Sequence, residues 1–299
     1  MGAERWLGAE ADLAGDARLD DLVERVRASA KYAQVTPSLI RRIGARELAA
    51  HRSAREALKA TQRRLHQVGA AYLEGRIRYE EWLDRLRVAR EEGEEAFRRE
   101  CRQMMRLHAS TRERLPIMPR FFQETLAEIA PVHSVIDVAC GLGPLAIPWM
   151  PLAPGARYRA YDIYEDLAAF LSAFLPLAGV DGYAEARDVG GDPPGGESRD
   201  AEADLALVLK FVPNAEQLAG GLAIHLLDSL PARHLLVSFP AAALGGRDKG
   251  MAENYERAFR EMVADRPWRL TPFRYAEELA FLVEKPHHQG RKEHKGREE

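Results

Sequence analysis

The sequence predicts an α/β protein with an all-helical N-terminal part, and three observations lead to this class. The chain has 299 residues, 46% hydrophobic and 30% charged, so it is long enough to bury more than one core. Residues 20–114 contain few glycines or prolines and repeat apolar residues at helical spacing. After Pro131, short apolar runs alternate with helical stretches and Gly/Pro loops, which is typical of a doubly wound sheet.

The N-terminal part is predicted to be helical because its apolar residues recur every three or four positions, as at Leu58 and Leu65. Thr36-Pro37 is typical of a helix start, with Thr as the cap and Pro in the first turn. Residues 79–105 carry opposite charges three or four positions apart. This spacing indicates a helical stretch with one packed and one solvated face.

Seven strands are predicted after the helical part. The first five have the continuous apolar character of buried parallel strands. The last two are separated by little more than Glu277 and Glu278, which predicts an antiparallel hairpin. The expected strands are 134–139, 158–163, 183–188, 204–210, 234–239, 269–275 and 279–284. This organisation predicts a helical domain at 1–118, a sheet domain at 119–286 and a disordered polar tail at 287–299.

Charge is unevenly distributed along the chain. Residues 1–120 hold 25 basic and 19 acidic side chains, whereas the remainder holds 18 and 27. Between residues 25 and 66, eleven basic residues face two acidic ones. Such a patch favours a polyanionic partner such as RNA, although a solvated helix face gives the same pattern.

Several classes of protein are excluded by composition. The chain has no apolar run of bilayer length and no signal-peptide pattern at its start, so we expect a cytoplasmic protein without membrane contact. Two cysteines are too few for a disulfide framework or a Cys-rich zinc site, and no metal site is predicted. Cys140 is expected to be a small packing residue rather than a nucleophile.

The strongest local motif runs from Val135 to Leu145, where a buried strand leads into a glycine turn. A dinucleotide site is one interpretation, with Gly141 and Gly143 in the pyrophosphate turn. Asp137 favours S-adenosylmethionine instead, because an acid at the strand end suits the ammonium group of that cofactor. Pro144 also removes one backbone N–H that a phosphate would use.

Two further acids end the next two predicted strands. Asp162 is positioned to accept hydrogen bonds from ribose hydroxyls, and Asp188 from an adenine amino group. Parallel strands end at one edge of the sheet, so the acids are expected to lie together there. Helix caps or turn residues are the alternative interpretation of both. The preferred fold is therefore a Rossmann-like class I methyltransferase.

Four separated segments resemble one known family. They are Leu107 to Leu115, Asp137 to Leu142, Val237 to Pro240 and Leu244 to Met251. The segments resemble the aminoglycoside-resistance 16S ribosomal RNA methyltransferases that methylate guanine 1405 at N7. Lys31-Tyr32, Arg41-Arg42 and Arg64-Leu65-His66 extend the resemblance over most of residues 28–285. Gly143 departs from the Asn usual in acquired pathogen enzymes, and the Arg/Ala/Gly-rich composition suggests an antibiotic-producing actinomycete.

The resemblance implies a cofactor, a partner and roles for particular residues. The cofactor is S-adenosylmethionine, and the partner is the 30S subunit, docked through the helical domain; the protein is expected to be a monomer. The cofactor-binding candidates are His108, Thr111, Arg114, Asp137, Ala139, Gly141, Asp162, Ile163, Asp188 and Val189. The RNA-binding candidates are Lys31, Arg41, Arg42, Arg63, Arg64, His66, Arg247 and Lys249.

Guanine N7 carries a free in-plane lone pair, so methyl transfer to it requires no general base. Catalysis is then expected to rest on positioning and electrostatic fit. Lys210 and Phe211 follow the fourth predicted strand, where this fold holds its target base. Core packing for Phe211 and a structural charge pair for Lys210 remain the alternatives. Arg114 is the candidate clamp for the cofactor carboxylate, with pairing to a surface acid as its alternative.

Three other functions remain open at the level of sequence. A related enzyme would methylate a neighbouring adenine at N1 of 16S ribosomal RNA. A small-molecule methyltransferase would share the acids without needing the basic helices. A noncatalytic ribosome-binding factor with a methyltransferase fold would bind the 30S subunit without transferring a methyl group.

Overall fold

The computed structural model describes residues 17–67, 77–194, 202–241 and 250–286. Its centre is a seven-stranded sheet with the order β3-β2-β1-β4-β5-β7-β6. Neighbouring strands are parallel except for the pairs β5–β7 and β6–β7. The strands are β1 (Val132–Val138), β2 (Leu152–Asp162), β3 (Asp181–Ala186), β4 (Ala203–Leu209), β5 (Ala232–Pro240), β6 (Arg269–Arg274) and β7 (Glu278–Glu284). The doubly wound sheet and its antiparallel ending are confirmed.

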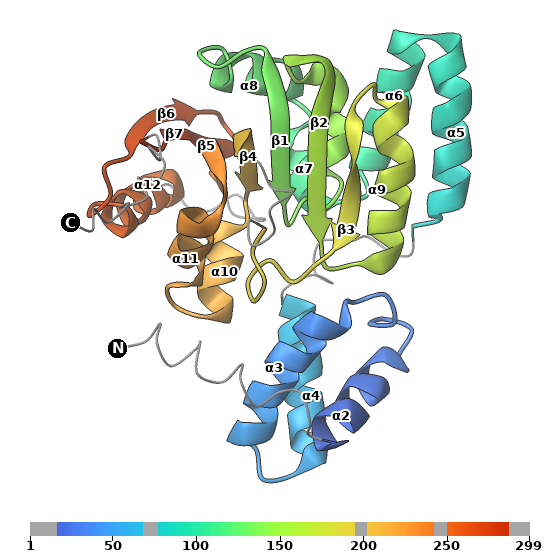
Figure 1. Ribbon diagram of the computed structural model, residues 1–299, viewed down its shortest axis with the longest axis vertical. Coiled ribbons are helices and arrows are strands. Elements are labelled where there is room, and N and C mark those ends of the chain that lie inside the picture. The colour runs from blue at the N-terminus through green and yellow to red at the C-terminus, as the bar shows by residue number, and fades with distance from the viewer. Residues whose placement is uncertain (1–16, 68–76, 195–201, 242–249, 287–299) are drawn as a thin grey trace, which may run out of the picture.

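Helices cover both faces of the sheet and one of its ends (Figure 1). They are α2 (Ala17–Arg27), α3 (Pro37–Ala50), α4 (Ala54–Leu65), α5 (Tyr79–Glu92), α6 (Glu94–Met105), α7 (Ala109–Arg114), α8 (Met118–Thr125), α9 (Glu165–Leu177), α10 (Val212–Leu218), α11 (Leu222–Ser229) and α12 (Met251–Met262). The predicted helix start at Thr36-Pro37 is confirmed. Gly93, with φ +116°, separates α5 from α6.

Alternate residues of each strand enter two different cores, because successive side chains of a strand point to opposite faces. Val135 and Leu207 pack with α5, α6, α8 and α9 on one face. Ile136 and Val208 pack with α10, α11 and α12 on the other. The sheet therefore forms the rigid middle layer, and its strand ends are available for a site.

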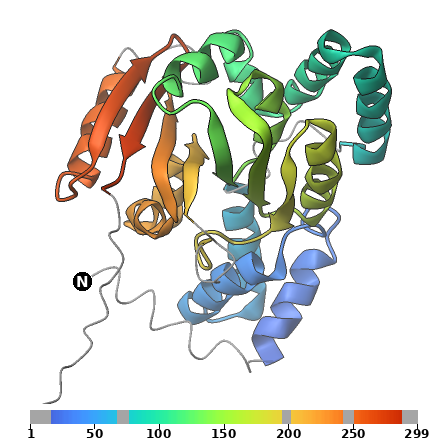
Figure 2. The same cartoon turned by 45° about the horizontal axis from the view of Figure 1, so that its top comes forward.

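Helices α2, α3 and α4 form a separate small core, which we call the three-helix subdomain. Val26, Ile40 and Leu65 belong to this core. The subdomain lies beyond the carboxyl ends of the parallel strands, and the turned view keeps it there (Figures 1 and 2). Phe97 and Met104 of α6 instead share the core of the sheet. The helical domain predicted for 1–118 is thus divided by packing, since α5 to α8 bury their apolar faces against the sheet.

The segment after the glycine turn is helical but not an α-helix. It is a 3-10 helix, η2 (Gly143–Trp149). Pro148 lies inside this helix and lacks the N–H group that a continuing α-helix would use, which favours a short helix. Among the described residues, no helix is long and apolar enough to cross a bilayer.

Candidate functional site

A cavity of about 380 Å³ lies at the carboxyl ends of the parallel strands. Loops following β1, β2, β3 and β4 all contribute to its wall, together with the start of α7. Predicted site residues in its lining are His108, Ala139, Gly141, Asp162, Ile163, Asp188, Val189, Lys210 and Phe211. Residues far apart in sequence converge here because parallel strands end at a common edge.

The turn after β1 brings the backbone close to the cavity. Ala139 and Gly141 both have positive φ, at +50° and +51°. A Cβ atom on Gly141 would lie 3.0 Å from Nε2 of His108. The imidazole thus packs directly on the glycine. Burial, with Arg114 as a smaller cause, lowers the pKa of His108 to about 4, so the ring is neutral at pH 7.

Asp162 fixes this turn from the end of β2. Its Oδ2 accepts a hydrogen bond from the Gly141 N–H at 2.8 Å, and its Oδ1 accepts one from the Ile163 N–H at 2.7 Å. Burial raises the pKa of Asp162, while these backbone donors oppose the rise. Asp162 therefore holds the turn in shape and also lines the cavity.

Asp137 lies beneath the turn and is not part of the cavity lining. The side chain is buried and accepts a hydrogen bond from the Tyr158 hydroxyl at 2.7 Å. Burial raises the pKa of Asp137 to about 7. A Cβ on Gly143 would lie 3.2 Å from its Oδ2. In this structure the Asp137 carboxyl group packs beneath the turn. The predicted contact with a cofactor ammonium stays a prediction.

Asp188 follows β3 and pairs with the three-helix subdomain. Arg42 of α3 donates to both of its carboxylate oxygens, with Nη2 to Oδ1 at 2.8 Å. The two side chains are 9% and 6% exposed, so the pair is buried. The sequence predicts an RNA contact for Arg42. In the structure, its side chain lines the cavity instead.

Arg114 lies behind the cavity in a buried ion pair. Its Nε and Nη2 donate to the Glu278 carboxylate at 2.6–3.1 Å, and both side chains are at most 1% exposed. Lys210 lies 3.5 Å from the same carboxylate and 2.7 Å from Glu113. The alternative predicted for Arg114 was a surface acid, whereas the acid that it pairs with is buried. Its cofactor contact stays a prediction.

Lys210 adopts φ +57°, an uncommon backbone conformation for a residue with a side chain. Its ammonium is 7% exposed at the cavity wall. Phe211 lines the same cavity and also packs against the core of α10 to α12. Thr111 is buried outside the cavity and donates to the carbonyls of Met105 and His108. It therefore positions the loop that carries the imidazole.

The predicted RNA-binding residues divide into two groups. Lys31, Arg63 and His66 line a shallow pocket of about 620 Å³ on the three-helix subdomain, and Lys31 Nζ lies 3.1 Å from His66 Nδ1. Arg41 pairs with Asp20, and Arg64 lies 3.7 Å from Glu47. The structure therefore leaves a basic surface around the first group. Arg247 and Lys249 lie outside the described residues.

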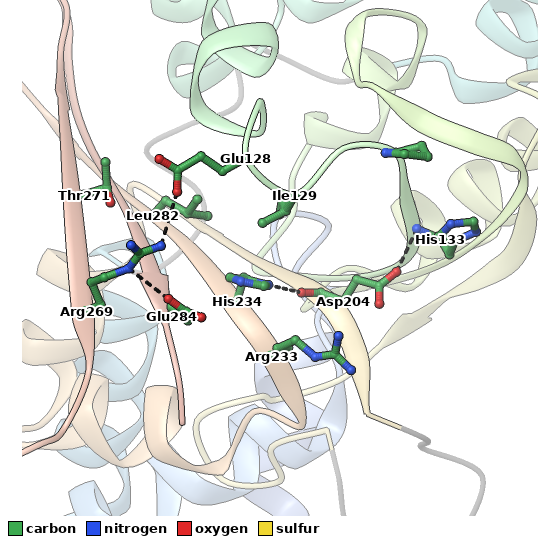
Figure 3. A pocket seen from close by; sticks show the side chains of 11 residues that line it. Glu128, Ile129, His133, Asp204, Arg233, His234, Arg269, Thr271, Leu282 and Glu284 are labelled. Atoms are coloured by element: carbon green, nitrogen blue, oxygen red, sulfur yellow. Dashed lines mark hydrogen bonds and ion pairs between the residues drawn. The ribbon is translucent and has the colours of Figure 1, made fainter. Parts of the chain in front are cut away.

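A second pocket, of about 410 Å³, lies at the opposite edge of the sheet (Figure 3). Arg269 pairs with Glu128 and Glu284, while Asp204 accepts the backbone N–H groups of His133 and Ser134. This pocket lies at the amino ends of the parallel strands, away from the cavity at their carboxyl ends.

The family model described as "Ribosomal RNA methyltransferase (FmrO)" matches residues 28–282. The chain belongs to the FmrO family. A relative from Micromonospora rosea is 34% identical over 91% of this chain and 98% of its own length. One from Frankia casuarinae is 36% identical over 89% and 93%. Both carry the name 16S rRNA (guanine(1405)-N(7))-methyltransferase.

Solved structures agree with the FmrO assignment. The 16S rRNA methyltransferase RmtF, determined with S-adenosyl-L-homocysteine, has a TM-score of 0.73 and 29% identity, covering 91% of this chain and 100% of that one. The 16S rRNA methylase RmtB has a TM-score of 0.72 and 28% identity, covering 90% and 98%. The predicted family resemblance and the methyltransferase fold class are both confirmed.

Sequence reasoning missed several residues of this FmrO family member. In the sequence, Glu278 was noted only as a residue between the last two predicted strands. In the structure it is 0% exposed and pairs with Arg114 and Lys210. Tyr158 and Leu39 were not among the predicted site residues, although Tyr158 donates to Asp137 and Leu39 lines the cavity. An acid directly before an apolar strand was the available signal for Glu278, because an acid buried there needs a partner.

Proposed function

We propose that the protein transfers a methyl group from S-adenosylmethionine to N7 of guanine 1405 of 16S ribosomal RNA in the 30S subunit, which confers aminoglycoside resistance. The observation that carries this proposal is the match to the ribosomal RNA methyltransferase family over residues 28–282. The relatives named for this reaction extend along nearly the whole chain. The cavity at the strand ends supports it independently.

The residues present fit the cofactor. Asp162 and Asp188 supply carboxylate oxygens for hydroxyl and amino donors, while Ile163 and Val189 line the wall beside them. Gly141 leaves room at the turn that a Cβ would fill against His108. The neutral His108 ring adds no charge beside a sulfonium group. The acceptors and the apolar wall thus suit a nucleoside carrying a cationic tail.

The chemistry asks the protein for positioning rather than proton transfer. When bound, S-adenosylmethionine supplies an electrophilic methyl group. Guanine N7 attacks with its own lone pair, so no side chain has to remove a proton. Phe211 lines the cavity where a target base would stack, and Lys210 is held beside it by Glu113 and Glu278. Fixed charges of this kind need no reorganisation during the reaction.

The RNA partner is recognised through the three-helix subdomain. Lys31, Lys59 and Arg63 lie around one shallow pocket beyond the strand ends. Such cations neutralise phosphates and release counterions, which fixes orientation without reading sequence. The 30S subunit therefore docks on the same end of the molecule that holds the cavity.

A single assay tests substrate and chemistry together. Purified protein is incubated with 30S subunits and methyl-labelled S-adenosylmethionine, and the modified nucleotide is mapped. Label at N7 of guanine 1405 is expected, with the Asp162→Ala variant as the inactive control. Label at adenine N1 would move the enzyme to the sister activity. Salt-sensitive 30S binding without label would support the noncatalytic ribosome-binding factor.

A further inference from the structure

Helix α3 belongs to the three-helix subdomain, yet it forms part of the cavity wall through Leu39 and Arg42. The segment before it is tied to the sheet domain by backbone hydrogen bonds. Thr36 N–H donates to the Ile163 carbonyl at 2.8 Å, and Glu165 N–H donates to the Gln34 carbonyl at 2.7 Å. The position of α3 relative to the cavity is therefore fixed by main-chain contacts.

The loop after β3 is shaped around the guanidinium of Arg42. A Cβ on Gly191 would lie 2.9 Å from Cδ of Arg42, and one on Gly190 would lie 3.1 Å from its Nη2. A side chain at either position would therefore crowd the arginine. Both glycines thus leave room beside the β3 loop for a side chain of the three-helix subdomain.

The ion pair leaves limited room on Asp188. A carboxylate offers roughly four lone-pair sites. Arg42 uses both oxygens, and the Gly190 N–H donates to Oδ1 at 3.3 Å. About one acceptor position remains on a carboxylate that lines the cavity. An oriented single acceptor suits one N–H of an exocyclic amino group.

We propose that Arg42 is a positioning residue of the cofactor site, which orients the Asp188 carboxylate so that the adenine amino group is selected. The inference rests on the proposed cofactor and goes beyond it by assigning base selectivity to a helix of the RNA-docking subdomain.

Removing the guanidinium is expected to change the base preference. Without Arg42, the Asp188 carboxylate loses both side-chain donors that orient it. A carboxylate accepts hydrogen bonds, so it favours a donor on the base over an acceptor. Adenine presents an amino donor at position 6, and hypoxanthine presents a carbonyl acceptor there. Once the carboxylate is no longer held in place, the preference for adenine over hypoxanthine is expected to shrink.

The test is calorimetric titration of the full chain with S-adenosylhomocysteine and with its hypoxanthine analogue, S-inosylhomocysteine. Arg42→Gln is expected to bind S-adenosylhomocysteine about tenfold to a hundredfold more weakly, the range for loss of a charged hydrogen bond. Its adenine preference is expected to shrink. Arg42→Lys keeps the positive charge but lacks the planar guanidinium with its two parallel donors. It is expected to be intermediate in affinity and in adenine preference.

Arg27→Gln is the matched control, because Arg27 pairs with Glu165 across the same contact between subdomains at 2.7 Å. It is expected to keep wild-type affinity and preference. The inference is overturned if Arg42→Gln keeps both, or if Arg27→Gln loses them equally. Should Arg42→Gln not fold, unchanged preference in Arg42→Lys overturns it. Wild-type protein that binds neither ligand would instead refute the proposed cofactor.

Discussion

Gly141 combines a backbone conformation and a close contact that other residues tolerate poorly. Its φ is +51°, and an added Cβ would meet His108 at 3.0 Å. Gly155 has φ +66° with nothing within 4 Å of an added Cβ. The two positions thus share the backbone strain and differ in the collision beside the cavity.

Gly141→Ala is expected to lose S-adenosylhomocysteine binding, whereas Gly155→Ala is expected to keep it. Both variants should lose about 1–2 kcal/mol of stability from the left-handed backbone. Displacement of His108 and of the turn held by Asp162 should affect the first variant alone. Calorimetric titration and thermal unfolding check this, and equal cofactor affinity in the two variants contradicts it.

Asp137 gives a pH dependence with a defined sign. Burial raises its pKa to about 7 from the ordinary value of 3.8, so the folded protein holds a proton that the unfolded chain releases between these pH values. Its contribution to stability is complete below the unfolded pKa and is lost as pH rises to about 7. Above that pH the contribution is constant.

The Asp137→Asn variant lacks this titration while keeping an acceptor for Tyr158. The stability of wild type relative to the variant is therefore expected to fall between pH 4 and 7, by on the order of 1 kcal/mol per pH unit. Chemical denaturation of both proteins across this range measures the difference, in which other carboxyl groups cancel. If the difference in stability between the two proteins does not change with pH, Asp137 does not take up the proton.

Glu278→Gln is expected to destabilise the protein strongly, because Arg114 and Lys210 lose their shared buried partner. Breaking a buried pair on one side costs about 3–5 kcal/mol. Asp84→Asn, in an exposed pair with Arg87, is expected to stay within about 1 kcal/mol of wild type. Urea unfolding compares the two variants, and similar losses would mean that Glu278 is not structurally important.

At the scale of elements, the start of α4 shows how local structure supports docking. The Ser53 hydroxyl accepts the Glu56 N–H at 3.2 Å and caps the helix that carries Lys59 and Arg63. Ser53→Ala is expected to cost about 1 kcal/mol and to weaken 30S binding. Ser53→Asp, which can also cap, is expected to restore both. Thermal unfolding and a 30S binding titration check this, and loss of binding in both variants contradicts it.

At the scale of the whole molecule, RNA docking and cofactor binding use different surfaces at one end. Replacing Lys31 and Arg63 by Gln is expected to make 30S binding less salt-dependent, lowering the slope by about one to two. Affinity for S-adenosylhomocysteine should not change, because neither residue lines the cavity. Arg87→Gln on α5 is the control, and an unchanged salt slope in the double variant argues against phosphate contacts there.

The sequence by itself determined the class of fold and the family. Strand alternation, the β6–β7 hairpin and the acids at three strand ends are local patterns, and local patterns can be read without knowing distances. Separated motifs such as Asp137 to Leu142 carried the family resemblance. The helix start at Pro37 was equally local, because cap and proline preferences act within one turn.

Only the tertiary structure decided which charges meet. Arg42 and Asp188 are 146 residues apart, and Arg114 and Glu278 are 164 apart, so no local pattern relates them. The family resemblance assigned Arg42 to RNA and Arg114 to the cofactor, and the sequence does not show which acid either side chain meets. The structure pairs both with buried acids. A buried charge requires a partner in space, and only the folded chain brings that partner within reach.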